Sequence, residues 1–224
     1  MNSSSDSYKR YVLFILTGMY AFNFIDRQIL VILQEPIKAE LMLNDTQLGL
    51  LTGFYFAILY TALGLPIARY ADKNNRKNVI SISLVFWSAM TALSGLAQNF
   101  VQLSMARIGV AIGEAGGSPP AHSIISDYYE PEKRATALSI YSMGVYIGIF
   151  LGFLIGGIIA KHYGWRMALF ALGLPGILYA VLLWFTVKEP IKGQMDADDI
   201  HKKELTFGEV VRILMSKKSF ISLP

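Results

Sequence analysis

Cysteine is absent from this sequence, and charged residues make up only 16% of its 224 residues. Without cysteine there is no disulfide framework, no thiolate metal site and no cysteine nucleophile. A soluble domain of this size usually carries about a quarter charged residues and interrupts its apolar runs to keep one face in water. Here hydrophobic residues make up 54% and form long runs, so the composition indicates a membrane protein.

Six apolar stretches are long enough to cross a lipid bilayer as helices. A hydrocarbon core of about 30 Å requires about 20 apolar residues, and backbone polar groups inside it must be paired within the segment. The weak alternation typical of barrel strands is not seen. We therefore predict an all-α, polytopic membrane protein whose residues 11–187 form a bundle of six transmembrane helices. The predicted spans are residues 11–33, 48–68, 79–97, 100–125, 135–160 and 167–187.

The chain begins with a polar tail, residues 1–10, and the order of charged and then apolar residues is also that of a signal peptide. No small-residue cleavage pattern follows this start. The apolar segment continues instead into Asn23, Asp26 and Arg27. We therefore predict a retained first helix.

The basic residues lie mostly on one side of the predicted bundle. If both ends of the chain face the cytoplasm, fifteen of the 20 Lys and Arg residues lie in cytoplasmic segments, as the positive-inside rule requires. This topology explains the net charge of +4 without a nucleic-acid partner. We expect an integral protein of the inner or plasma membrane of a bacterium, surrounded by membrane lipids. The fifteen residues are Lys9, Arg10, Arg69, Lys73, Arg76, Lys77, Lys133, Arg134, Lys188, Lys192, Lys202, Lys203, Arg212, Lys217 and Lys218.

The region after the last predicted span, residues 188–224, is mostly polar and is predicted to be a cytoplasmic linker. Thr206 and Glu209 have the spacing of a capping box ahead of apolar residues that share one helical face over 207–214. A short amphipathic helix on the membrane surface and a partly ordered linker both fit this pattern. The final residues, SFISLP, resemble the start of a seventh hydrophobic segment, so we expect a second half to follow.

Four ionisable residues lie inside the predicted spans: Asp26 and Arg27 on the first, Arg107 and Glu114 on the fourth. Each costs about 2.5–3.5 kcal/mol near the bilayer centre, so such residues usually find partners in a polar interior. At about 1.5 Å per residue, Asp26 and Arg107 lie near the same depth and Glu114 lies about 10 Å deeper. The cluster either takes part in function or only holds the first and fourth helices together.

Arg107 and Glu114 are seven residues apart and share a helix face, where neighbouring glycine and alanine residues allow close approach. Pro119 and Pro120 should then disturb the helix below Glu114. A conformational change that separates a buried carboxylate from an arginine changes the proton affinity of the carboxylate. We hypothesise that Glu114, and secondarily Asp26, exchanges a proton as the protein alternates between outward and inward openings.

A loop motif and several helix motifs resemble those of known membrane proteins. Residues 68–77, ARYADKNNRK, resemble the signature loop of the major facilitator superfamily, with two glycines replaced by Ala68 and Asn75. Arg107 with Gly113 is similar to the fourth-helix motif of that superfamily. The combination of NFIDR at 23–27, GEA at 113–115, SDYY at 126–129 and RATALSI at 134–140 looks like that of its spinster-type transporters.

The resemblance implies a twelve-helix fold of two six-helix bundles, of which this chain holds the amino-terminal one. It implies coupling and gating roles for Asp26, Arg27 and Glu114, and matches Arg107 to the fourth-helix arginine. Protons are the expected coupling ion and no other cofactor is expected. The implied cargo is an amphipathic lipid, although a similar Asp-Arg pairing on the first helix occurs in transporters of organic anions such as sugar acids.

The resemblance also assigns residues of the cytoplasmic loop. Arg76 is expected to pair with Asp127, and Asp72 to meet a helix end in the other bundle. Read from the residues alone, Lys73, Arg76 and Lys77 could equally be topological anchors.

A ladder of small residues on the fifth span resembles that of the family, and the simplest interpretation is close helix packing. It consists of Gly148, Gly152, Gly156 and Gly157.

Two other classes of protein have sequence features that overlap with these. An intramembrane serine hydrolase would need Ser118 with His122 or His162, but neither histidine has clear reach and no third orienting residue is evident, so we do not expect an enzyme. A six-helix module for membrane assembly or signalling, acting without transport, also fits the predicted fold.

Overall fold

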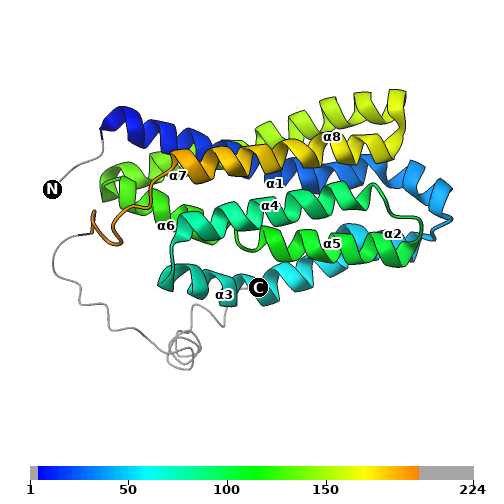
Figure 1. Ribbon diagram of the computed structural model, residues 1–224, viewed down its shortest axis with the longest axis horizontal. Coiled ribbons are helices and arrows are strands. Elements are labelled where there is room, and N and C mark those ends of the chain that lie inside the picture. Colours follow the sequence, from blue (N-terminus) through cyan, green and yellow to red (C-terminus); the bar gives the residue numbers. More distant parts are fainter. Residues whose placement is uncertain (1–4, 197–224) are drawn as a thin grey trace, which may run out of the picture.

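The computed structural model describes residues 5–196, and every regular element in that range is helical (Figure 1). The predicted amphipathic segment over 207–214 and the start of a seventh segment lie outside the described residues. The α-helices are α1 (Asp6–Leu41), α2 (Asp45–Gly49), α3 (Tyr55–Lys73), α4 (Arg76–Ser94), α5 (Phe100–Glu114), α6 (Ser118–Tyr128), α7 (Pro131–Leu151) and α8 (Gly157–Thr186), and the π-helical segments are η1 (Leu50–Phe54) and η2 (Gly152–Gly156).

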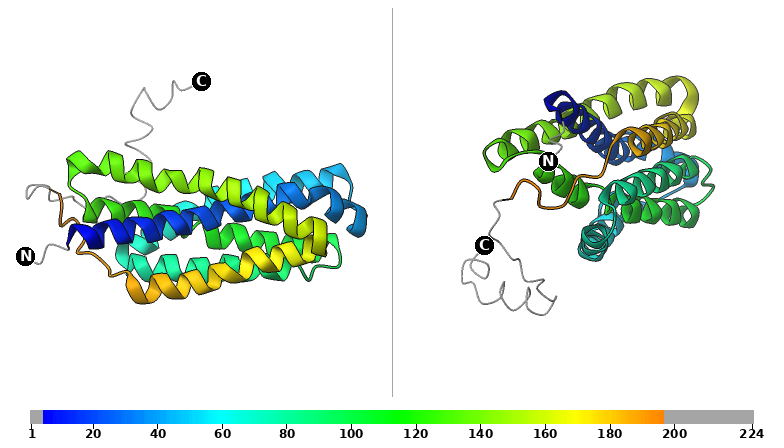
Figure 2. Two further views of the ribbon diagram at one scale, coloured as in Figure 1. Left: turned by 90° about the horizontal axis from the view of Figure 1, so that it is seen from above. Right: turned by 60° about the vertical axis from the view of Figure 1, so that its left-hand side comes forward.

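The long helices run side by side along the long axis of the molecule (Figures 1 and 2). Three continuous helical stretches are long and apolar enough to cross a membrane by length and composition: Asp6–Leu41, Asp45–Lys73 and Pro131–Thr186. The last stretch turns back on itself at Gly164, whose φ of 84° and ψ of 165° are not helical. Only glycine adopts such a conformation without strain, so this one stretch supplies two antiparallel passes.

The fourth predicted span, 100–125, is divided into α5 and α6. The helix is interrupted immediately after Glu114, and Pro119 lies in the first turn of α6, where a missing backbone N–H does no harm. The predicted disturbance below Glu114 is therefore present. Glu114 is therefore the last residue of α5, and α6 begins at Ser118 after a short turn.

Helices α1 and α7 pack closely because α7 presents glycines to the backbone of α1. A Cβ atom on Gly148 would lie 2.4 Å from the carbonyl oxygen of Ala21, and one on Gly144 would lie 2.6 Å from that of Thr17. Neither position leaves room for a side chain. Gly144 thus extends the predicted ladder by one turn.

Of the remaining glycines in the ladder, Gly152 and Gly156 contact α1 and Gly157 does not. A Cβ on Gly152 would lie 3.4 Å from the Cα of Ile25, which is ordinary contact, and a Cβ on Gly156 would lie 2.4 Å from Cδ1 of Ile29. Gly157 was also predicted to pack, but a Cβ there would meet no atom of the described residues within 4 Å, so Gly157 does not contact α1 in this structure. The reason is geometric: adjacent residues on a helix point in directions about 100° apart, and Gly156 already takes the position that faces α1.

Candidate functional site

The four charged residues predicted to lie inside the bundle form two ion pairs between α1 and α5. Arg27 Nε donates a hydrogen bond to Glu114 Oε2 at 2.8 Å, where Glu114 is fully buried and the Arg27 side chain is 28% exposed. Arg107 Nη1 lies 3.5 Å from Asp26 Oδ1, and both side chains are buried. The similar depth predicted for Asp26 and Arg107 agrees with this contact.

Asp26 has a second partner that the sequence did not reveal. The hydroxyl of Thr91, on α4, donates a hydrogen bond to Asp26 Oδ1. A threonine in an apolar helix usually bonds its own backbone, so nothing in the sequence marks Thr91 as different from Thr17, whose hydroxyl donates to the carbonyl oxygen of Leu13 at 2.8 Å. Asp26 is therefore held between α4 and α5.

Several buried polar atoms around these pairs have no hydrogen-bond partner within the described part of the chain. They include Oε1 of Glu114, Nε and Nη1 of Arg107, and Oδ1 of Asn23. Buried polar groups are normally satisfied, and exceptions mark places where water, a ligand or another conformation completes the hydrogen bonds. The cluster is thus only partly satisfied in this conformation.

Aromatic rings surround the exposed part of Arg27. Its Cζ lies 4.5 Å from the ring centroid of Phe56, 4.9 Å from that of Tyr60 and 5.2 Å from that of Phe24. A guanidinium at these distances is attracted to the faces of the rings. Phe56 and Tyr60 come from α3 and Phe24 from α1, the helix that carries Arg27, so two helices meet at one cation. This arrangement offers positive charge and apolar surface side by side.

The aromatic surface continues toward α6 and α7. Tyr20 stacks on Tyr141 with ring centroids 4.4 Å apart, and His122 packs edge-on against Tyr141 at 5.1 Å. The hydrolase alternative would need His122 or His162 beside Ser118. In the structure His122 contacts the ring of Tyr141, and His162 is exposed close to the bend at Gly164.

The loop between α3 and α4, predicted to be cytoplasmic, leads into a second charge cluster, centred on Arg76, which is 2% exposed. Arg76 Nη1 donates to Asp127 Oδ2 at 2.5 Å, and the ion pair expected from the family resemblance is therefore present. Its Nε donates to Glu189 Oε1 at 2.7 Å and its Nη2 to the carbonyl oxygen of Pro190 at 3.2 Å. Every side-chain nitrogen of Arg76 thus has a partner.

Glu189 lies in the segment after α8 that was predicted to be a linker. Its Oε2 accepts from the backbone N–H of Lys77 at 2.8 Å, and a carboxylate at the amino end of a helix is favoured by the helix dipole. Asp127 Oδ1 accepts from the backbone N–H of Gly193 at 2.9 Å. Residues 187–196 are therefore bound across the ends of α4 and α6. Among the predicted loop residues, Asp72 and Lys73 are exposed, so the partner implied for Asp72 in another bundle stays a prediction.

Several long apolar helices, with buried and partly satisfied ion pairs between α1 and α5, form the architecture of one half of a membrane transporter. The chain belongs to the Major Facilitator Superfamily, whose family model matches residues 16–221. It forms the amino-terminal half of that transporter fold and has an integral, multi-pass architecture.

Within this superfamily, the chain is similar to spinster-type transporters. A crystal structure of a bacterial homologue of the human lysosomal transporter Spinster, inward-facing and unoccupied, is 40% identical with a TM-score of 0.87 over 98% of this chain and 51% of that one. An "MFS-type efflux pump" of Mycolicibacterium smegmatis is 35% identical over 77% of this chain and 40% of its own length. The "Sphingosine-1-phosphate transporter SPNS2" of Danio rerio is 31% identical over 81% of this chain and 36% of its own length. The chain thus spans about half or less of the relatives that it matches.

Proposed function

We propose that this chain is the amino-terminal half of a secondary active transporter that couples protons to the movement of an amphipathic, anionic, lipid-like cargo by alternating access. The observation that carries the proposal is the Arg27–Glu114 pair. Within residues 5–196, Glu114 is fully buried with one carboxylate oxygen unpartnered, whereas its cationic hydrogen-bond partner, Arg27, is partly exposed and so reachable by cargo. The carboxyl-terminal bundle is the expected partner, and the bias of basic residues toward one side supports a cytoplasmic location for both ends of this chain.

The coupling of cargo binding to proton binding follows from competition between the cargo anion and Glu114 for Arg27. An anionic cargo group that binds the guanidinium weakens the hydrogen bond from Arg27 Nε to Glu114. Without that partner, the buried carboxylate is stabilised by taking up a proton, because burial disfavours the charged form. Cargo binding and proton binding then favour each other, and by linkage the effect is reciprocal. This arrangement supports co-transport of a cargo anion with a proton.

The surroundings of Arg27 support an amphipathic cargo. The rings of Phe24, Phe56 and Tyr60 lie within 5.2 Å of the guanidinium and extend its site into an apolar surface. A cargo with an anionic head and a hydrocarbon body satisfies both features. A small organic acid of the sugar-acid type uses the guanidinium and leaves the aromatic surface largely unused, so it is the second candidate.

Proton flux in vesicles tests the proposal. The complete protein is reconstituted with an internal pH dye, and lysophospholipid, phosphorylated sphingoid lipid and sugar acid are offered separately. We expect cargo-dependent proton movement that is abolished by Glu114→Gln and reduced by Asp26→Asn. Glu35→Gln is the matched control, because Glu35 is an exposed carboxylate on the same helix as Asp26. Unchanged proton movement in Glu114→Gln would falsify the assignment of the coupling residue, and movement with sugar acid alone would favour the second candidate.

A further inference from the structure

A groove on the outside of the bundle lies between α4 and α8, away from the charges on α1 and α5. It has a volume of about 520 Å³, which is within the range of ligand-binding clefts. Its walls are almost wholly apolar and include Ile82, Val85 and Phe86 from α4 and Val181, Trp184 and Phe185 from α8. All six are exposed, so the groove opens to the surroundings of the bundle.

The groove has a cation at the end where the basic loop lies. Lys77 Nζ lies 5.3 Å from the ring centroid of Trp184 and donates to the carbonyl oxygen of Trp184 at 3.1 Å. Among the described residues no carboxylate forms an ion pair with Lys77, and the nearby Glu189 is engaged by Arg76 and by the backbone N–H of Lys77. A tryptophan and a lysine together are typical anchors at the level of lipid head groups.

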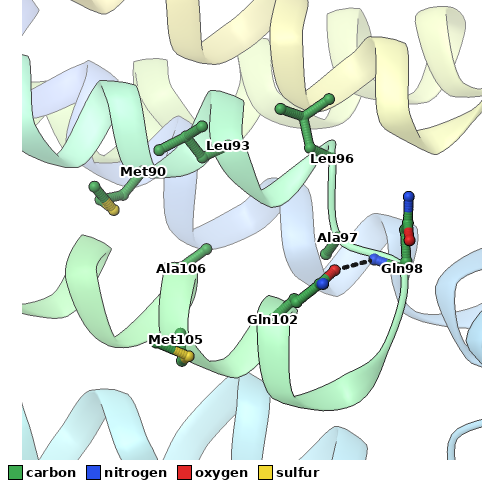
Figure 3. Close-up of a pocket in the computed structure, with 8 residues that line it drawn as sticks. All are labelled: Met90, Leu93, Leu96, Ala97, Gln98, Gln102, Met105 and Ala106. Carbon is green, nitrogen blue, oxygen red and sulfur yellow. Dashed lines mark hydrogen bonds between the residues drawn. The ribbon is translucent and has the colours of Figure 1, made fainter.

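A second hollow of the same volume, about 520 Å³, provides a contrast. It lies between α4 and α5, and its lining side chains are apolar except for Gln98 and Gln102 (Figure 3). The backbone N–H of Gln98 donates to Gln102 Oε1 at 2.8 Å, and Figure 3 shows this hydrogen bond. The side-chain oxygen of Gln102 therefore already has a partner within the protein. No ionisable side chain lines either the groove or this hollow, but a cation lies beside each. Beside the hollow, Arg166 donates to the carbonyl oxygen of Ala97 at 2.6 Å and is paired with Glu40. Lys77, beside the groove, contacts Trp184 and has no carboxylate ion-pair partner among the described residues, and this free charge distinguishes the groove from the hollow.

We propose that the groove between α4 and α8 is a binding site for an anionic phospholipid. One acyl chain lies along Val85 and Val181, and the phosphate contacts the ammonium group of Lys77. The positive end of an otherwise apolar groove complements the negative end of an otherwise apolar lipid. In the proposed orientation the lipid belongs to the cytoplasmic leaflet, where anionic lipids gather.

Native mass spectrometry of the complete protein tests this site. Phosphatidylglycerol and phosphatidylcholine with identical acyl chains are added in competition, and the bound ratio is measured. We expect a preference for phosphatidylglycerol that falls about fivefold in Lys77→Gln, the factor corresponding to one basic residue near a membrane surface. Lys73→Gln is the matched control, because Lys73 is an exposed lysine of the same loop, whereas Lys77 is the lysine that contacts Trp184 in the groove wall; Lys73→Gln should leave the preference unchanged.

A second pair of variants tests the groove itself. Val85→Phe fills the groove and should reduce retention of both lipids, whereas Met105→Phe, which fills the contrasting hollow, should not reduce the preference for phosphatidylglycerol. A monodisperse elution profile shows that each variant is folded. Equal retention of the two lipids by the unmodified protein, equal effects of Lys77→Gln and Lys73→Gln, or no effect of Val85→Phe would each overturn the proposal. So would a dimer that Val85→Phe dissociates, because a second copy would then occupy the groove.

Discussion

Two charge clusters in this chain use the same residue types and differ in how completely they are satisfied. The loop cluster, Arg76 with Asp127 and Glu189, pairs every side-chain nitrogen of its arginine. The membrane cluster, Asp26, Arg27, Arg107 and Glu114, leaves buried nitrogen and oxygen atoms without partners among the described residues. A fully satisfied network fixes one conformation, whereas a partly satisfied one can exchange partners at little cost. We infer that the first cluster is structural and the second is functional.

The largest expected effect is on stability and comes from the loop cluster. Arg76→Gln leaves the carboxylates of Asp127 and Glu189 without their cation, and breaking a buried ion pair in this way costs about 3–5 kcal/mol. The free energy of unfolding of the complete protein in detergent measures the loss. Lys73→Gln, an exposed change in the same loop, should stay within about 0.5 kcal/mol. Equal stability of the two variants would contradict a structural role for Arg76.

The packing of α1 against α7 tests how the membrane cluster is held in place. In Gly148→Ala the new Cβ would lie 2.4 Å from the carbonyl oxygen of Ala21, so α1 must shift, and overpacking of this kind costs about 1–3 kcal/mol. In Gly157→Ala the Cβ meets nothing within 4 Å, and alanine is favoured over glycine within a helix. Thermal unfolding should therefore separate the two variants, with Gly148→Ala less stable and Gly157→Ala at least as stable as the unmodified protein.

A smaller effect, on transport, is expected at Thr91. Thr91→Val keeps the shape of the side chain and removes the hydroxyl that donates to Asp26. Losing a hydrogen bond of about 1 kcal/mol should lower the initial uptake rate about fivefold at a fixed proton gradient. Thr91→Ser retains the hydroxyl and should retain most of the rate. If the serine and valine variants transport equally well, the hydrogen bond to Asp26 has no part in the cycle.

The smallest effect concerns the exposed ion pair between Arg166 and Glu40, near the carboxyl end of α1. The hydrogen bond from Trp165 Nε1 to Glu40, at 2.6 Å, together with Arg166, holds the pKa of Glu40 below its ordinary value of 4.5. A lowered folded-state pKa gives stability above pH 4.5 that is lost as the pH falls through the lowered pKa. Glu40→Gln should therefore unfold at a lower temperature than the unmodified protein at pH 7, and the difference should shrink below pH 4.5. A difference that does not change with pH would show that the charge of Glu40 contributes nothing.

Much of the fold follows from the sequence because long apolar runs and the bilayer thickness leave few alternatives. The interruption after Glu114 was also predictable, because Pro119 and Pro120 cannot continue a helix unchanged. The π-helical turns η1 and η2 were not predicted, since a single widened turn hardly changes the helical period of a long apolar segment. Helix α1 passes Pro36 and ends at Leu41, eight residues beyond the predicted span, because a proline within a helix can be accommodated by the surrounding structure.

The candidate site was predictable where charge was the signal. Asp26, Arg27, Arg107 and Glu114 were identifiable because ionisable residues are expensive inside a membrane. Thr91 was not, because hydroxyl side chains are common in apolar helices and usually bond their own backbone. The rings around Arg27 could not be selected among the many aromatic residues of the spans, because their role depends on the meeting of α1 and α3.

In the proposed cycle, cargo binding transfers Arg27 away from Glu114, and Glu114 then takes up a proton. The most direct measurement is the number of protons taken up when cargo is added to the complete, detergent-solubilised protein in weakly buffered solution with a pH dye. The account predicts uptake of about one proton per protein, as linkage requires for a single carboxylate, with no uptake in Glu114→Gln and full uptake in Glu35→Gln. Equal proton uptake by the unmodified protein and Glu114→Gln would contradict the account.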